Sequence, residues 1–133
     1  MTNVEERLAL SEQICEAQKK QAEADAILGQ KEIALKYATE VRDLASDGVK
    51  FNRKNMQYMK SRAEVVDINE YRGARQLLRN VTDEYDAACD KVRKLQREVQ
   101  YYDNVVSAAV RAIELARDGL AQFGRLIQWR PRD

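Results

Sequence analysis

The chain of 133 residues contains no histidine, one proline, five glycines and two cysteines. Histidine is the usual general base and the commonest metal ligand, so its absence removes every Ser-His and Cys-His arrangement. We therefore expect no catalytic residue, no metal site and no cofactor, and we predict that the chain is not an enzyme. The single proline, Pro131, follows the last expected helix, so the sequence has few residues that would break one.

Disulfide frameworks, membrane spans and a strong net charge are also missing. Cys15 and Cys89 are too few for a disulfide framework. This favours a reducing, intracellular setting, and we expect a cytoplasmic protein. The formal net charge of +1 gives no general argument for nucleic acid or anionic membranes. No apolar run reaches about 18 residues, so we expect no membrane partner.

The second half of the chain carries a continuous apolar series at alternating steps of three and four residues. A repeat of about 3.5 residues is typical of a coiled-coil helix, because it keeps one seam facing a partner along the whole length. The members of this series are Tyr71, Ala74, Leu78, Val81, Tyr85, Ala88, Val92, Leu95, Val99, Tyr102, Val106, Ala109, Ile113, Ala116, Leu120, Phe123 and Ile127.

The first half carries a matching series with four polar members, at Gln21, Lys31, Arg42 and Asn52. The spacing predicts one helix through Gly48, although Asp47-Gly48 alone would suggest a break. The full series is Leu10, Ile14, Ala17, Gln21, Ala24, Leu28, Lys31, Leu35, Ala38, Arg42, Ala45, Val49, Asn52, Met56, Met59, Ala63 and Val66.

A short connection joins the two halves. The segment from Asp67 to Glu70 matches a helix-capping arrangement, so the second helix should begin near Ile68. We predict one all-α domain over 1–133, with a helix at about 3–66, a turn at about 66–69 and a helix at about 68–130. These would form a long antiparallel helical hairpin that assembles into a four-helix or larger bundle. The alternative is a compact three-helix bundle with a break near Gly48.

The two series also predict a register. Seam residues whose numbers add to 137 should face each other in an antiparallel pair. Leu35 would then face Tyr102, Ala38 would face Val99, and Asn52 would face Tyr85, whose hydroxyl could bond to the amide.

Each helix has a second apolar series, at the positions just before the seam residues. Both series should fall on the same side of the hairpin, and a contiguous exposed apolar stripe usually marks a binding surface. We expect the chain to bind itself or another helical protein through these residues, although burial within its own three- or four-helix bundle remains open. The interface residues would be Ile27, Ala34, Tyr37, Val41, Leu44, Phe51, Tyr58, Val65, Tyr101, Val105, Ala108, Ala112, Leu115, Leu126 and Trp129.

A basic cluster lies on both sides of the predicted turn, where residues 49–80 carry eight basic and three acidic side chains. Such a tip could bind phosphate groups of nucleic acid, although solvated surface charge is the simpler interpretation. Its members are Lys50, Arg53, Lys54, Lys60, Arg62, Arg72, Arg75 and Arg79.

The sequence therefore supports two functional hypotheses. The first is a non-enzymatic coiled-coil interaction or assembly protein that acts through the second apolar stripe. The alternative is a nucleic-acid-binding or packaging accessory protein that acts through the basic tip.

Overall fold

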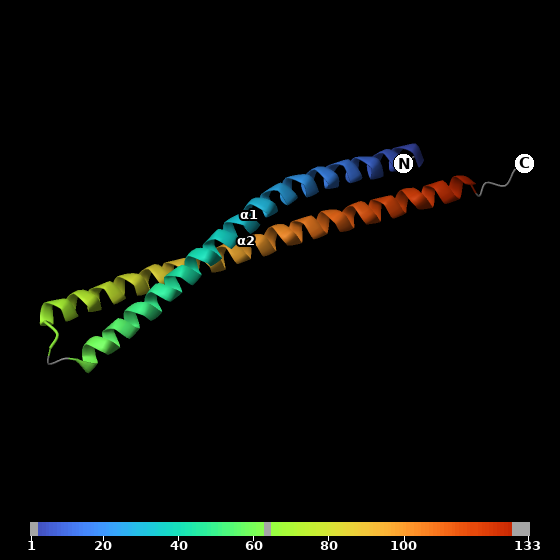
Figure 1. Cartoon of the computed structure of the whole chain (residues 1–133). Helices are drawn as coiled ribbons and strands as arrows, with labels where there is room; N and C mark the ends of the chain where they lie inside the picture. The colour runs from blue at the N-terminus through green and yellow to red at the C-terminus, as the bar shows by residue number, and fades with distance from the viewer. Residues whose placement is uncertain (1–2, 63–64, 129–133) are drawn as a thin grey trace, which may run out of the picture. The chain divides into compact units, whose positions relative to one another are not determined.

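The computed structural model describes residues 3–62 and 65–128, and for 124–128 the backbone alone. It contains two helices, α1 (Asn3–Ser61) and α2 (Ile68–Gln128), and the described residues include no strand. The two helices run in opposite directions and pack against each other (Figure 1). The predicted all-α helical hairpin is confirmed.

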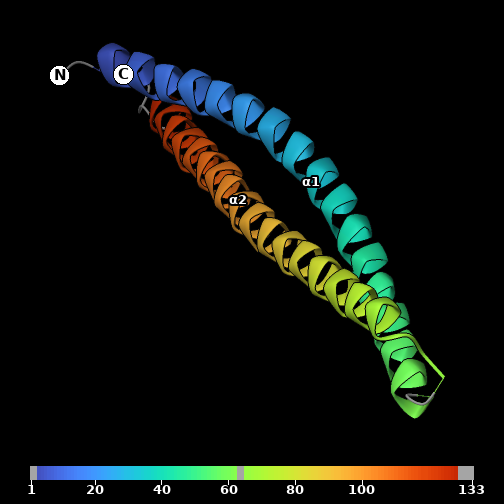
Figure 2. The same cartoon turned by 90° about the vertical axis from the view of Figure 1, so that its left-hand side faces the viewer.

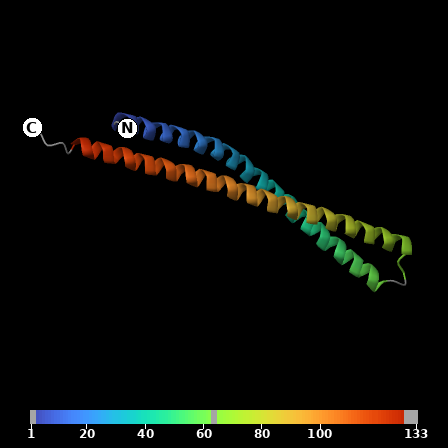
Figure 3. The ribbon, with the colours of Figure 1, turned by 180° about the vertical axis from the view of Figure 1, so that it is seen from behind.

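The structure divides into two compact units, which are described separately. Unit 1 comprises residues 1–30 and 98–133, and in it the first part of α1 lies beside the last part of α2 (Figure 2). Unit 2 comprises residues 31–97 and contains the connection between the two helices (Figure 3).

Helix α1 continues without interruption through Gly48. The side-chain amide of Asn52, which is only 9% exposed, donates a hydrogen bond of 2.7 Å to the Gly48 carbonyl oxygen one turn earlier. This bond satisfies the buried amide within its own helix. The alternative of a three-helix bundle with a break near Gly48 is wrong.

Helix α1 ends at Ser61 instead of Val66, so the connection between the helices begins earlier than the predicted turn at 66–69. The amide of Arg62 donates to the Met59 carbonyl over 3.1 Å, which tightens the last helical turn. The amides of Val65 and Val66 both donate to the carbonyl of Arg62. These bonds turn the chain before the apolar pair Val65-Val66 can extend the helix.

Helix α2 begins at Ile68, as predicted. The carboxylate of Asp67 accepts a hydrogen bond of 3.1 Å from the amide of Asn69, and its carbonyl accepts one of 3.1 Å from the amide of Tyr71. Asp67 is therefore the N-cap that the sequence predicted, since its side chain satisfies an amide that has no partner within the helix.

The apolar seams form the contact between the helices in each unit. Every described side chain of both seams is buried or half-buried. In unit 2, Ala38, Val92 and Leu95 form a buried cluster with Ala34 and Leu35 packed against it. The buried seam residues of unit 1 are Ala17, Ala24, Ala109, Ile113 and Ala116. The repeat of about 3.5 residues thus identified the correct faces of both helices.

The predicted register is wrong by about one heptad. In unit 2, Ala38 and Leu35 pack with Val92 and Leu95 rather than with Val99 and Tyr102. The residue numbers of these contacts add to about 130 instead of 137. Unit 1 gives the same offset independently. A Cβ built on Gly119 would lie 3.2 Å from Cδ1 of Leu10, and the numbers of these two residues add to 129. The earlier end of α1 explains the shift, since it moves the turn toward the N-terminus.

The shift also separates Asn52 from Tyr85, so the expected amide-to-phenol hydrogen bond is wrong. Asn52 bonds to Gly48 instead. The side-chain interaction with Cys89, one turn later in α2, is the main cause that raises the pKa of Tyr85 above its usual value. The buried amide of Asn52 is thus satisfied within its own helix.

Candidate interaction site

An apolar row runs along α1 in unit 2, and we call it the α1 stripe: Ala34, Tyr37, Val41, Leu44, Gly48, Phe51 and Tyr58. Leu44 is 72% exposed and Phe51 is 71% exposed, and Tyr37, Val41 and Tyr58 are also more than half exposed. Gly48 is open as well, since a Cβ built there would meet nothing within 4 Å. The described part of unit 2 therefore leaves this row uncovered except at Ala34, which is half-buried and packs against the buried cluster.

The stripe is exposed because each member precedes a residue of the seam with α2. A step of one residue turns the side chain by about 100° around a helix, so a member points beside the partner helix rather than at it. Val65 also belongs to the predicted interface, but it lies beyond the end of α1 in the connection and is exposed there. Ile27 is half-buried and lies in unit 1.

The same face of unit 2 is polar on α2. The positions that precede the α2 seam residues include Glu84, Lys91 and Lys94, all of which are exposed. Leu77 is the one large apolar side chain among them, and it is half exposed. Among the described residues of unit 2, therefore, only α1 offers an extended apolar row, and Asn55 interrupts it between Phe51 and Tyr58.

Unit 1 has a separate apolar row on α2, the α2 stripe: Tyr101, Val105, Ala108, Ala112 and Leu115. Tyr101 and Leu115 are 62% and 63% exposed, Ala108 and Ala112 are exposed, and Val105 is half-buried. The predicted interface residues Leu126 and Trp129 lie outside the described side chains. Gly119, which follows the α2 stripe by one helical turn, is covered by Leu10 of the same chain.

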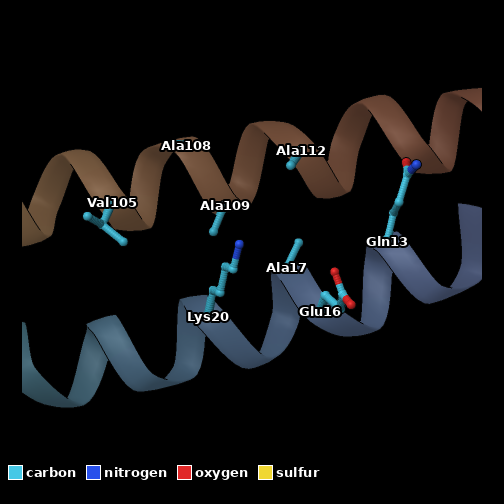
Figure 4. Close-up of a pocket in the computed structure, with 8 residues that line it drawn as sticks. All are labelled: Gln13, Glu16, Ala17, Lys20, Val105, Ala108, Ala109 and Ala112. Atoms are coloured by element: carbon cyan, nitrogen blue, oxygen red, sulfur yellow. The ribbon is translucent and has the colours of Figure 1, made fainter.

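A groove of about 410 Å³ lies beside the α2 stripe. Its α2 side is formed by Val105, Ala108, Ala109 and Ala112, and its α1 side by Gln13, Glu16, Ala17 and Lys20. Figure 4 shows the Lys20 side chain extending from α1 toward Ala109, with small alanine side chains on the opposite helix. Gln13, Glu16 and Lys20 precede seam residues of α1, so the positions just before both seams lie on one side of unit 1. The apolar spacing in the sequence gives no signal for these residues, because their side chains are polar.

The basic tip lies entirely in unit 2, on both sides of the connection. All eight of its predicted side chains are exposed. The guanidinium of Arg62 lies 5.1 Å from the centre of the Tyr58 ring, a distance typical of a cation–π contact. None of the eight forms an ion pair with a described residue. The basic tip therefore lies directly next to the last member of the α1 stripe.

The described residues include no group of three or more His, Cys, Asp or Glu side chains placed to hold a metal ion. Cys15 is exposed and Cys89 is half-buried, and both are free thiols. Asp90 accepts a bond of 3.1 Å from Arg93, an exposed pair within α2. No helix in the described part of the chain has a long enough apolar stretch to span a membrane.

Comparison of the chain with protein-family models, with curated proteins and with solved structures gave no match. The geometry of the two stripes and the basic tip is therefore the basis for a functional proposal.

Proposed function

We propose that this chain is a non-enzymatic coiled-coil interaction or assembly protein that binds through the α1 and α2 stripes. Its partner is a further copy of the chain or another helical protein. Free thiols at both cysteines and the lack of histidine fit a cytoplasmic protein without catalytic activity.

The concentration of exposed apolar side chains carries this proposal. Among the described residues, thirteen large hydrophobic side chains are at least half exposed, and seven of them belong to the two stripes. Singly scattered apolar residues are normal on a protein surface, whereas rows at helical spacing indicate that a partner covers them. Each such side chain would contribute roughly 1–2 kcal/mol if fully covered.

Recovery of the protein from its native lysate, with and without nuclease, tests this proposal. Protein partners that remain bound after nuclease treatment, and that are lost when Leu44 or Leu115 is replaced by lysine, support it. Partners that disappear with the nucleic acid would contradict it.

The basic tip supports a second candidate function, binding of nucleic acid in a packaging or accessory role. Eight exposed cations without ion pairs to described residues leave their charge available to phosphate groups. Tyr58 and Tyr71 lie among them in the sequence and could stack on exposed bases.

Reversal of Arg72, Arg75 and Arg79 to glutamate should strongly weaken such binding. Each lost phosphate contact reduces the slope of log K against log salt by roughly 0.7–0.9, so the three reversals should reduce it by about 2 to 3. Fluorescence anisotropy with labelled single-stranded and duplex nucleic acid at several salt concentrations measures both effects. The matched control reverses Lys91, Lys94 and Arg97 in the same helix, which changes the net charge equally. Equal losses for both triple variants, or binding that does not depend on salt, would rule out a specific role for the tip.

A further inference from the structure

Charges of opposite sign border the α1 stripe on the two sides of Gly48. Between residues 40 and 54, the acids Glu40, Asp43 and Asp47 precede Gly48, whereas the bases Lys50, Arg53 and Lys54 follow it, and all six side chains are exposed. Arg42 is the one basic residue before Gly48 in this segment, and it is half-buried. Among described residues their only ion pair is a contact of 3.4 Å between Asp43 and Arg42. A partner whose charges run in the opposite order would be complementary along this segment.

A second copy of α1 in antiparallel orientation has this order. Rotation about a two-fold axis close to Ser46 brings the acidic half of one copy beside the basic half of the other. Both copies then use the same surface, as a closed two-fold dimer requires.

The sizes of the stripe residues also fit this orientation. Leu44 is the most exposed large side chain of the α1 stripe, and Gly48, one turn later, is open space. With Leu44 of one copy against Gly48 of the other, Val41 meets Phe51, Tyr37 meets Asn55 and Ala34 meets Tyr58. Each of these layers is formed twice by symmetry and places a larger side chain against a smaller one, as close packing of helices requires. The layer of Tyr37 and Asn55 is the one that includes a polar side chain.

The polar face of α2 in unit 2 indicates which helices make contact. A face-to-face bundle of two hairpins would bury this face of both helices and would desolvate Glu84, Lys91 and Lys94 of α2. A contact between the two copies of α1 leaves these charges in water and covers the apolar row. The uneven distribution of apolar residues between the helices of unit 2 therefore favours a contact through α1 alone.

From these observations we infer that the α1 stripe of unit 2 binds the α1 stripe of a second copy, antiparallel, with Leu44 facing Gly48. This inference rests on the proposed interaction function of the stripe and names its partner. At the edge of the contact, Glu40 of each copy lies beside Lys54 of the other. Asp47 lies at the axis opposite Asp47 of the second copy, and Lys50 of its own helix compensates its charge one turn later.

Single charge reversals and their mixture test this arrangement. In a dimer of the Glu40→Lys variant, both contacts between positions 40 and 54 join two lysines. In a dimer of the Lys54→Glu variant, both contacts join two glutamates. Each variant alone should raise the dissociation constant about 5- to 30-fold at low salt. An equimolar mixture should form a heterodimer with near wild-type affinity, because both edge contacts then join opposite charges. Sedimentation equilibrium measures the masses.

Asp43→Lys is the matched control, since it reverses an exposed acid of the same helix that lies outside these edge contacts. Its mixture with Lys54→Glu should restore less association than the mixture with Glu40→Lys, because Glu40 of one copy still lies beside a glutamate at position 54 of the other. Complementation by Asp43→Lys instead of Glu40→Lys would overturn the proposed register. Single reversals that leave the mass unchanged, or a mixture that restores nothing, would overturn the antiparallel contact.

Failure of this inference can be told from failure of the proposed function. A wild-type chain that remains monomeric at about 100 µM overturns the second copy as partner. If Leu44→Lys then still removes a protein partner recovered from the lysate, the stripe retains its interaction function. If Leu44→Lys changes neither mass nor partners, both the inference and the role of the α1 stripe fail.

Discussion

Replacement of Val92 by aspartate should unfold unit 2 at a much lower denaturant concentration than the wild-type chain needs. Val92 is only 2% exposed and packs beside Ala38 and Leu95 in the buried cluster between the helices. An unpaired carboxylate at such a site costs about 3–5 kcal/mol, because no partner replaces its water. Val92→Ala, which only removes two methyl groups, should cost roughly 2 kcal/mol. Urea unfolding followed by circular dichroism gives both values.

Ala87→Asp is the control for this substitution, because it introduces the same carboxylate into the same helix at an exposed position. Its cost should be limited to helix propensity, at about 0.5 kcal/mol. If Val92→Asp and Ala87→Asp shift the unfolding midpoint equally, Val92 does not occupy a dry contact between the helices.

The helices and their contacting faces could be predicted from the sequence because a long helix exposes a simple repeat. Seventeen seam positions in each half alternate by three and four residues, and all that the structure describes are at least half-buried. The start of α2 could also be predicted, because the capping side chain of Asp67 has a local signature that does not depend on packing.

The register could not be predicted in the same way. A shift of seven residues places every seam residue opposite another seam residue of the correct type, so meshing of the two series determines the register only to within a heptad. The position of the turn decides among the alternatives. Val65 and Val66 continue the apolar pattern beyond Ser61, although the bonds to the Arg62 carbonyl already turn the chain there.

The apolar residues of the candidate site could be predicted from the sequence, whereas its polar residues could not. Leu44 and Leu115 stand out because their spacing repeats the seam one residue earlier. Lys20 occupies an equivalent position on α1, but a lysine at a single position carries no signal until the groove shows what lies opposite. The exposure of the α1 stripe could be determined only from the fold, because a helix break near Gly48 would have allowed the chain to bury these side chains.

The heptad ambiguity that affected the hairpin applies equally to any association of two α1 stripes. Apolar spacing alone would accept several antiparallel registers. Charge order and the open space at Gly48 are not periodic, so they distinguish one register from its neighbours. This is why charge reversal at Glu40 and Lys54 provides a sharper test of the arrangement than the removal of another apolar side chain.

Lysine at Leu44 or at Leu115 should remove binding through the corresponding stripe while the helices remain intact. Leu44 lies in unit 2 and Leu115 in unit 1, so the two variants examine the α1 and α2 stripes separately. Both side chains are mostly exposed in the single chain, and their loss should therefore hardly change helicity measured by circular dichroism. In a two-fold dimer each substitution acts twice, and the loss of roughly 1.5–2 kcal/mol per leucine raises the dissociation constant about 100- to 1,000-fold.

Gln57→Lys on α1 and Ser107→Lys on α2 are the controls, since each adds the same charge at an exposed position away from both the seam and the stripe. Sedimentation equilibrium should show unchanged association for the controls. If only Leu44→Lys reduces association, binding is assigned to the α1 stripe. If only Leu115→Lys reduces association, it is assigned to the α2 stripe. Unchanged mass and unchanged partners for both leucine variants would mean that neither stripe is an interface. The remaining exposed feature would then be the basic tip, whose binding depends on salt rather than on leucine side chains.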